Sequence, residues 1–380
     1  VLSLMTDAYG DIPYNEAGKG DVSGLEFPHY QEQKEVYRLM LADLETANQL
    51  LKSLKADATI SDDILFNGDA VKWRKYANSL KIRILMRQSA KKDVSADIAA
   101  IFNNAQEYPV FTSIDDQATL VYNNTVDFYK WYIQPKNLPS DGSGVIFGDN
   151  FRVSEAIVDA LQTKDDPRLP VYVAPTKHSF EAHRANASVP FVYRGQPAGL
   201  SAAEQNEIDK DDYSVLSSTI RSESRAFVMT FAELQFLKAE AIIRGMITGN
   251  AADEYAKGIR ASMQKWAAIS SDDVDVYLAR PDVALNTAQN EALKQIGTQA
   301  WIDSFLNGFE AFANWRRTGY PELKVGTSVS SAIPVRYIYS DNEQNNPNLI
   351  SWTNEKIGRM VNETDMVWFQ PQKWNTNVNR

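Results

Sequence analysis

The sequence predicts a mainly α-helical fold in which two helical blocks bracket a loop-rich middle with short helices and little β-structure. In both blocks apolar residues recur at steps of three and four, as in a helix buried on one face. Between residues 103 and 225 this spacing is lost, and tyrosines, prolines and glycines interrupt short β-rich runs. We therefore divide one compact unit into an N-terminal helical part (1–102), a loop-rich subdomain (103–225) and a C-terminal helical part with an irregular tail (226–380).

The N-terminal block contains two expected helices. Apolar residues at helical spacing run from Gln31 to Leu54, with charges on the opposite face, and a second amphipathic pattern follows Asp69. A polar loop joins the two patterns, so we expect an antiparallel helix pair. In the loop-rich middle, one helical pattern extends from Ser154 to Leu161.

The C-terminal block begins with a capping signal. Thr230 and Glu233 have the spacing of a capping box, in which each side chain bonds a free backbone N–H near the other residue. Asn250 is expected to cap the next helix. An acidic loop is expected from Ser270 to Asp275, and the long helical segment after it begins near Thr287.

The segment from Trp301 to Pro321 carries the strongest helical pattern, apolar over most of its circumference. Gly308 in its middle suggests that another element packs close to the backbone, and Gly319 before Pro321 supplies the stop. One narrow seam is polar and must find water or partners. Its members are Asp303, Asn307, Glu310, Asn314 and Arg317. The tail after residue 340 is expected to be irregular.

Composition excludes several classes of protein. The formal net charge of -10 argues against binding to nucleic acid or to anionic lipid. There is no cysteine, which excludes disulfides, zinc-thiolate sites and cysteine nucleophiles. No apolar run approaches the roughly 20 residues that a membrane-spanning helix needs.

No reactive constellation is found, so we expect no enzyme, no cofactor and no metal site. His178 and His183 lack the spacing of a zinc protease, and the acidic clusters lack the pattern of a calcium loop. Glu233 and Glu240 lie on one helix face, but an axial separation of roughly 10.5 Å exceeds that of a glycosidase pair. Arg244 is placed to pair with Glu240 instead.

The aromatic content of the middle segment is the more suggestive feature. Tyr129 and Trp131 lie among asparagines and aspartate, and Phe191, Tyr193 and Arg194 follow in turn-rich sequence. A flat ring beside carboxamides, carboxylates or arginine suits the apolar face and hydroxyl rim of a sugar. For any single ring, however, the commoner role is to fill a small core beneath long loops.

Six motifs spread over nearly the whole chain allow a family to be recognised. They are YGDIPY (9–14), GDAVKWRKYANSLKIRILMR (68–87), DPRL (166–169), AELQFLKAEA (232–241), FLNGFEAFANWRRTGYP (305–321) and IPVRYIYSDNEQNNPN (333–348). Together and in this order they resemble the SusD/RagB family of outer-membrane nutrient-binding lipoproteins, in particular its SusD-like branch. The resemblance implies a scaffold of tetratricopeptide-like helix pairs, with the loop-rich subdomain laid over it and facing the ligand.

The resemblance also implies a function. Such a protein binds a nutrient, here expected to be an oligosaccharide, without catalysis and delivers it to a SusC-like TonB-dependent transporter. It is anchored by lipid to the exterior of the outer membrane, through an N-terminal segment that we expect this chain to lack, because it starts at Val1 in what reads as a helix. Family ligand loops lie around and after DPRL, which favours Tyr172, Phe191 and Tyr193 as ligand contacts.

Two alternatives remain open at this stage. A RagB-like member would bind a peptide, for which tyrosine-rich loops are equally suited. A helical-repeat interaction module would bind another protein and no small ligand.

Overall fold

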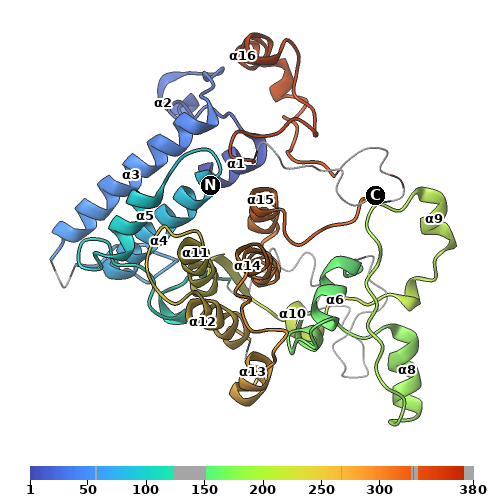
Figure 1. Ribbon diagram of the computed structural model, residues 1–380. Coiled ribbons are helices and arrows are strands. Elements are labelled where there is room, and N and C mark those ends of the chain that lie inside the picture. Colours follow the sequence, from blue (N-terminus) through green and yellow to red (C-terminus); the bar gives the residue numbers. More distant parts are fainter. Residues whose placement is uncertain (56–57, 123–150, 267, 327, 329–332, 372–380) are drawn as a thin grey trace.

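The computed structural model describes residues 1–55, 58–122, 151–266, 268–326, 328 and 333–371 (Figure 1). The described part contains sixteen α-helices, two strands and three labelled 3₁₀ turns, so the prediction of a mainly helical fold with little β-structure is confirmed. The α-helices are α1 (Leu2–Tyr9), α2 (Gly20–Ser23), α3 (Gln33–Ser53), α4 (Ala70–Gln88), α5 (Ser95–Phe102), α6 (Glu155–Gln162), α7 (Leu169–Tyr172), α8 (Lys177–Ala185), α9 (Ala202–Glu207), α10 (Ser218–Arg221), α11 (Phe231–Ile243), α12 (Ala251–Gln264), α13 (Ser271–Leu278), α14 (Gln289–Asp303), α15 (Gly308–Thr318) and α16 (Pro347–Ile357). The strands are β1 (Ala118–Val121) and β2 (Arg225–Met229), and the 3₁₀ turns are η1 (Ile114–Asp116), η4 (Lys210–Asp212) and η5 (Glu343–Asn345).

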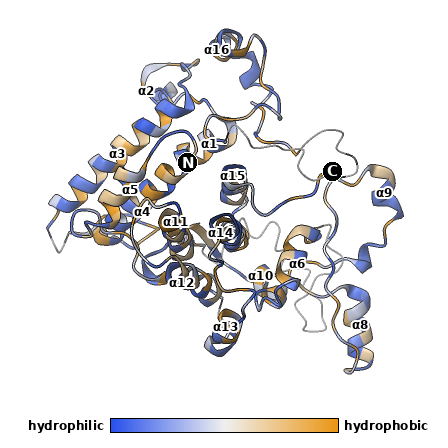
Figure 2. Cartoon of the chain, in the orientation of Figure 1, coloured by the Kyte–Doolittle hydropathy of each residue, from blue (hydrophilic) through white to orange (hydrophobic). Residues whose placement is uncertain are grey.

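Helices α3 and α4 form the expected antiparallel pair. The carboxylate of Asp69 accepts hydrogen bonds from two backbone N–H groups of the first turn of α4 and so caps it. Arg74, early in α4, donates to Asn48 near the end of α3 (2.9 Å), and Lys81 two turns later pairs with Glu45. The contacts run in opposite directions along the two helices. Figure 2 shows hydrophilic and hydrophobic residues alternating along α3, as expected for a helix buried on one face.

Helix α11 lies at the centre of the molecule and contributes to two apolar cores. Phe236 belongs to a core built with α6, α7 and α12–α14, whereas Leu234 and Leu237 belong to a core built with α4 and α5. In Figure 1, α11–α15 separate α3–α5 from α6 and α8–α10. Gly258 of α12 permits this packing, since a Cβ there would lie 2.5 Å from the Phe236 ring.

The caps of the C-terminal block are confirmed in one helix and half confirmed in another. Asn250 accepts hydrogen bonds from two N–H groups of α12, as expected. Thr230 accepts from the N–H of Glu233 (3.0 Å), but the carboxylate of Glu233 is bound to Arg83. The reciprocal half of the predicted capping box is therefore absent, because a buried arginine is the stronger partner for that carboxylate.

The expected continuous helix through 301–318 is wrong. The chain leaves the helix after Asp303 and turns through Leu306, whose φ is +72°, before α15 begins. Asn307 caps α15 by accepting from the N–H of Glu310 (3.4 Å). Gly308 is thus the first residue of α15, and a Cβ there would meet nothing within 4 Å, so our explanation of Gly308 by close packing was wrong as well.

Two segments expected to be irregular are helical. Ser270 and Asp273 form a capping box that starts α13, so the predicted acidic loop from Ser270 to Asp275 is the first part of a helix. In the tail, Asn346 caps α16 and Gly358 ends it in a left-handed conformation. The acidic and asparagine-rich stretches are helix starts, since these residues stabilise N-termini.

The β-structure joins distant parts of the chain. Strands β1 and β2 pair antiparallel, with Ala118 opposite Met229 and Val121 opposite Arg225. The β-rich run at 189–193 forms no strand; instead the carbonyl of Val192 accepts from the N–H of Thr176 (2.8 Å). Within the described ranges, no helix combines the length and the apolar character needed to span a bilayer.

Candidate functional site

Tyr172 lies inside the core, which corrects its prediction as a ligand contact. Its side chain is fully buried, and its ring stacks on Phe305 with centroids 4.3 Å apart and meets Trp266 edge-on at 5.5 Å. Burial raises the pKa of its phenol. Tyr172 ends the short helix α7, and the rings of Phe305 and Trp266 together with the surrounding core leave no face of its ring for a ligand.

The DPRL motif before Tyr172 is likewise buried. The guanidinium of Arg168 donates to both carboxylate oxygens of Asp166 (2.9 and 2.6 Å), and neither side chain is exposed. Arg168 also donates to Ser262 of α12 (3.0 Å) and to Gln299 of α14 (2.6 Å). The motif therefore ties the middle segment to the helical scaffold, a structural role that its sequence did not reveal.

Phe191, Tyr193 and Arg194 lie together on the segment that connects α8 to α9. Phe191 is 41% exposed, and one side of its ring contacts His183, with centroids 4.1 Å apart. The guanidinium of Arg194 lies over the ring of Tyr213 at 4.9 Å. The backbone is held as well, since the N–H of Ser214 donates to the carbonyl of Arg194 (2.8 Å).

Tyr193 is half-buried and packs against the larger apolar core. Burial raises the pKa of its phenol, so the hydroxyl stays protonated at neutral pH and can donate a hydrogen bond. The exposed ring of Phe191 offers an apolar platform, and Arg194 offers hydrogen-bond donors. These are the components that sugar recognition requires. Tyr129 and Trp131, the other two predicted contacts, lie outside the described residues.

A group of three exposed side chains close to this segment could hold a cation. Nε2 of His178 on α8 and carboxylate oxygens of Asp209 and Asp212 lie within 4.8 Å of one another. The imidazole already binds Asp209 (2.9 Å), and this contact raises the pKa of His178. Metal binding requires the neutral imidazole, so the raised pKa of His178 opposes it. The absence of a functional metal site stays a prediction.

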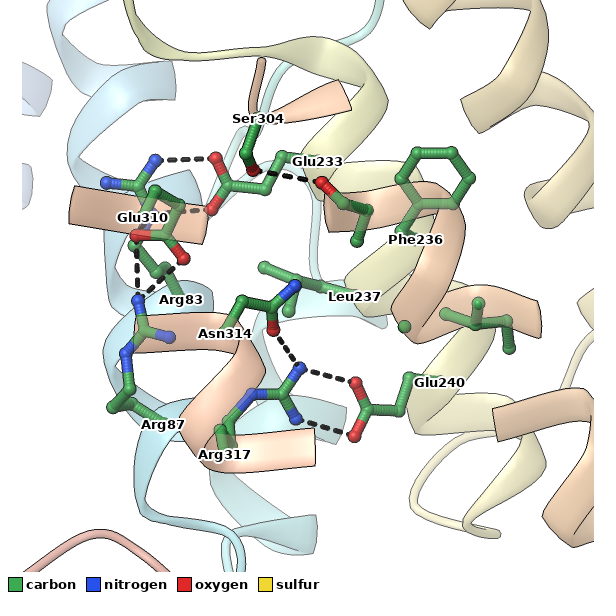
Figure 3. Close-up of a pocket in the computed structure, with 13 residues that line it drawn as sticks. Arg83, Arg87, Glu233, Phe236, Leu237, Glu240, Ser304, Glu310, Asn314 and Arg317 are labelled. Carbon is green, nitrogen blue, oxygen red and sulfur yellow. Dashed lines mark hydrogen bonds and ion pairs between the residues drawn. The ribbon is translucent and has the colours of Figure 1, made fainter. Parts of the chain in front are cut away.

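Three members of the predicted polar seam, Glu310, Asn314 and Arg317, lie on α15 and find partners in the protein interior (Figure 3). Glu310 accepts from Arg87 of α4 through both oxygens (2.6 and 2.7 Å). Arg317 donates to both oxygens of Glu240 of α11 (2.6 and 2.7 Å) and to Asn314 (2.8 Å). All five side chains are buried.

A third ion pair closes the arrangement. Arg83 of α4 donates to both carboxylate oxygens of Glu233 of α11, each at 2.5 Å. The three pairs therefore join α4 to α11, α4 to α15 and α15 to α11, and we call this set the ion-pair triangle. The space between them is about 10 Å³, room for about one water molecule and too small for a ligand.

The ion-pair triangle also bears on catalysis. Burial tends to raise the pKa of Glu240, but the charges of Arg317 and Arg244 outweigh burial and bring it to about 2. The predicted Glu240–Arg244 pair is confirmed at 2.8 Å. A general acid requires a proton at working pH and access to substrate. Glu240 lacks the proton, and Glu233, whose pKa burial raises, is buried and bound to Arg83, so neither carboxyl group has both.

The comparisons with known proteins agree with the recognised motifs. The SusD-like family model described as "Starch-binding associating with outer membrane" matches residues 1–340. Among solved structures, a nutrient-binding outer-membrane candidate from Bacteroides vulgatus is 27% identical, with 97% of this chain and 82% of that chain covered and a TM-score of 0.81. A SusD homologue from Bacteroides fragilis is 26% identical, with 96% and 80% covered and a TM-score of 0.75. A chitin-binding SusD homologue from Flavobacterium johnsoniae is 25% identical, with 97% and 78% covered and a TM-score of 0.76. No curated protein sequence matches this chain.

Proposed function

We propose that this chain, which belongs to the SusD-like family of starch-binding, outer-membrane-associated proteins, binds a nutrient oligosaccharide and releases it chemically unchanged. Two of the solved relatives are described as chitin-binding, which supports a glycan as the ligand. The observation on the molecule itself that carries the proposal is the exposed ring of Phe191 close in sequence to Arg194, on a segment pinned to the scaffold. Binding through such groups needs no reactive residue.

Delivery to a transporter is the second part of the proposal. We expect the protein to be held by a lipid anchor on the cell surface and to pass its ligand to a SusC-like TonB-dependent transporter. The family description supports association with the outer membrane. Affinity purification from detergent-solubilised outer membranes should recover a large β-barrel protein in stoichiometric amount. Recovery of the protein without any such barrel would contradict this part.

Ligand binding is tested with two neutral probes, maltohexaose and chitotetraose, in isothermal titration calorimetry. Phe191→Ala removes the exposed ring and should weaken binding about tenfold, equivalent to about 1.4 kcal/mol. Arg194→Ala removes donors and should also weaken it. Val192→Ala is the matched control, because Val192 lies on the same segment and is 51% exposed.

Three results would count against the proposal. Equal glycan affinities of wild type and Phe191→Ala would show that Phe191 does not contact the ligand. Shortened oligosaccharides in mass spectra of the recovered probe would contradict binding without catalysis. Capture of peptides by a protein that binds neither glycan would favour the RagB-like alternative.

A further inference from the structure

A groove of about 480 Å³ opens where residues from the N-terminal and C-terminal parts of the described chain meet. Its walls come from the turn after α1, the first residues of α3, α16 and the segment that follows α16. Its volume falls within the range of about 300–1,000 Å³ that is usual for small-ligand sites. None of the predicted ligand contacts lines it.

Two tryptophans give the groove fixed apolar surfaces. The indole N–H of Trp352 on α16 donates to the carboxylate of Asp11 (2.9 Å), which fixes the ring orientation. The ring of Trp368 packs against Tyr37 of α3, with centroids 6.1 Å apart. Both indoles are only half-buried. Held rings of this kind lose little conformational entropy when a ligand stacks on them.

Exposed apolar side chains extend these surfaces to the rim. Ile357 on α16 is 46% exposed and Met366 is 43% exposed, although both line the groove. Large apolar side chains at the mouth of a polar cavity are a feature of ligand sites.

The polar lining is balanced in charge. Three acidic and three basic side chains line the groove, so its formal charge is zero, in contrast to -10 for the whole chain. They are Asp11, Glu32, Asp365, Lys34, Arg336 and Lys356. Because neither sign prevails, the groove offers no attraction to a polyanion or a polycation. It offers closely spaced donors and acceptors.

Three of these charged side chains form a connected row at the groove. Lys356 pairs with Glu32, which also pairs with Lys34 (2.8 Å), and the ammonium of Lys356 lies over the Trp352 ring at 4.8 Å. All three charged side chains are at least one-third exposed and therefore reachable. A row of alternating donors and acceptors beside an indole matches the alternating hydroxyls and apolar face of a pyranose.

We propose that this groove is a second binding site for a neutral oligosaccharide, separate from the Phe191–Arg194 segment. The choice of a glycan rests on the proposed function, whereas the place and the neutrality of the ligand rest on the groove.

The test compares the same substitution at two positions of one helix. Ile357→Arg places a long charged side chain at the mouth of the groove. Ile350→Arg is the matched control, since Ile350 is on α16, is 40% exposed and does not line the groove. Calorimetric titration with maltohexaose and chitotetraose should give two sites for wild type and for Ile350→Arg, and one for Ile357→Arg. Equal melting temperatures show that the variants fold.

A second readout reports on the groove directly. Binding should change the indole fluorescence of wild type, and Trp352→Phe should remove at least half of that change while Phe191→Ala preserves it. One wild-type site that is lost in Phe191→Ala and unaffected by Ile357→Arg would overturn the groove and leave the proposed function standing. A wild type that binds neither glycan would overturn both.

Discussion

Replacement of Arg317 by methionine is the most direct test of the ion-pair triangle. The side chains of Arg317 and Glu240 are 4% and 3% exposed, and two short hydrogen bonds join them. Methionine keeps much of the apolar length of the side chain but removes the charge. Glu240 then keeps only Arg244, whose side chain is 35% exposed and contacts one of its oxygens. The remaining contact does not offset the free-energy cost of burying the charged carboxylate of Glu240.

The expected loss of stability follows from two routes. Because the arginine contacts outweigh burial, the pKa of Glu240 is about 2 rather than 4.5. Each pKa unit is worth about 1.4 kcal/mol, so ionised Glu240 contributes a net stabilisation of about 3 kcal/mol at neutral pH. Removing one partner of a buried ion pair typically costs about 3–5 kcal/mol. With 380 residues and about 2.1 cal/mol/K of unfolding entropy per residue, this range corresponds to a Tm lower by about 4–6 °C.

Differential scanning calorimetry at pH 7 measures this change, and the chain supplies a control. Arg38 donates to both carboxylate oxygens of Glu35 (2.8 and 2.7 Å), but this pair is on the surface. Arg38→Met also removes a bidentate pair, but one that is exposed to water, where such pairs contribute little to stability. Its Tm should match wild type within error. Equal Tm values for Arg317→Met and Arg38→Met would refute the reasoning, because burial would then make no difference.

Three further predictions use thermal unfolding. Because the folded-state pKa of Glu240 is depressed, its stabilisation is complete above about pH 4.5 and is lost as the pH falls toward about 2, so the Tm difference between wild type and Arg317→Met should narrow over that interval. Gly258→Ala forces a Cβ into an aromatic ring of α11, at an overpacking cost of about 1–3 kcal/mol, and should lower Tm by about 1–4 °C. Gly308→Ala is the control and should not lower Tm, because the new Cβ would meet no atom within 4 Å. Tyr172→Ala should lower Tm by about 4–6 °C, from about 3–5 kcal/mol for an emptied aromatic site, and an unchanged Tm would return Tyr172 to the list of ligand contacts.

The longest helices could be predicted from the sequence because their signals are local. The apolar period and the caps at Asp69 and Asn250 need only neighbouring residues to be recognised. The turn at Leu306 could not be predicted, since an apolar stripe continues across it and a leucine with positive φ gives no signal in the sequence. The helix after Ser270 was missed because its acidic first turn was read as a solvated loop, although acidic residues there favour a helix N-terminus.

The candidate site was predicted less well than the fold. Tyr172 and Phe191 lie in similar turn-rich sequence, yet one is fully buried and the other 41% exposed. The difference arises from Trp266 and Phe305, which lie more than ninety residues beyond Tyr172 in the sequence and cover its ring. The composition of a segment shows that an aromatic residue is present, but not which distant residues bury its ring. The groove on α16 was missed for the same reason, since its walls come from both ends of the chain.

The ion-pair triangle explains how a scaffold assembled from distant segments can hold its loops in one place. Apolar contacts between helices are weakly directional, so a helix could shift along its neighbour at modest cost. A bidentate arginine–carboxylate pair tolerates little displacement, because both hydrogen bonds depend on one relative position. Arg83–Glu233 and Arg317–Glu240 are such pairs, whereas in Arg87–Glu310 a single guanidinium nitrogen donates to both carboxylate oxygens. One ion pair therefore lies on each side of the triangle formed by α4, α11 and α15, and none of these helices is free to shift alone (Figure 3). Burying six charges is costly, and apolar residues could supply equal stability. What the charges add is a fixed register of the three helices, on which the elements packed against them depend for their position.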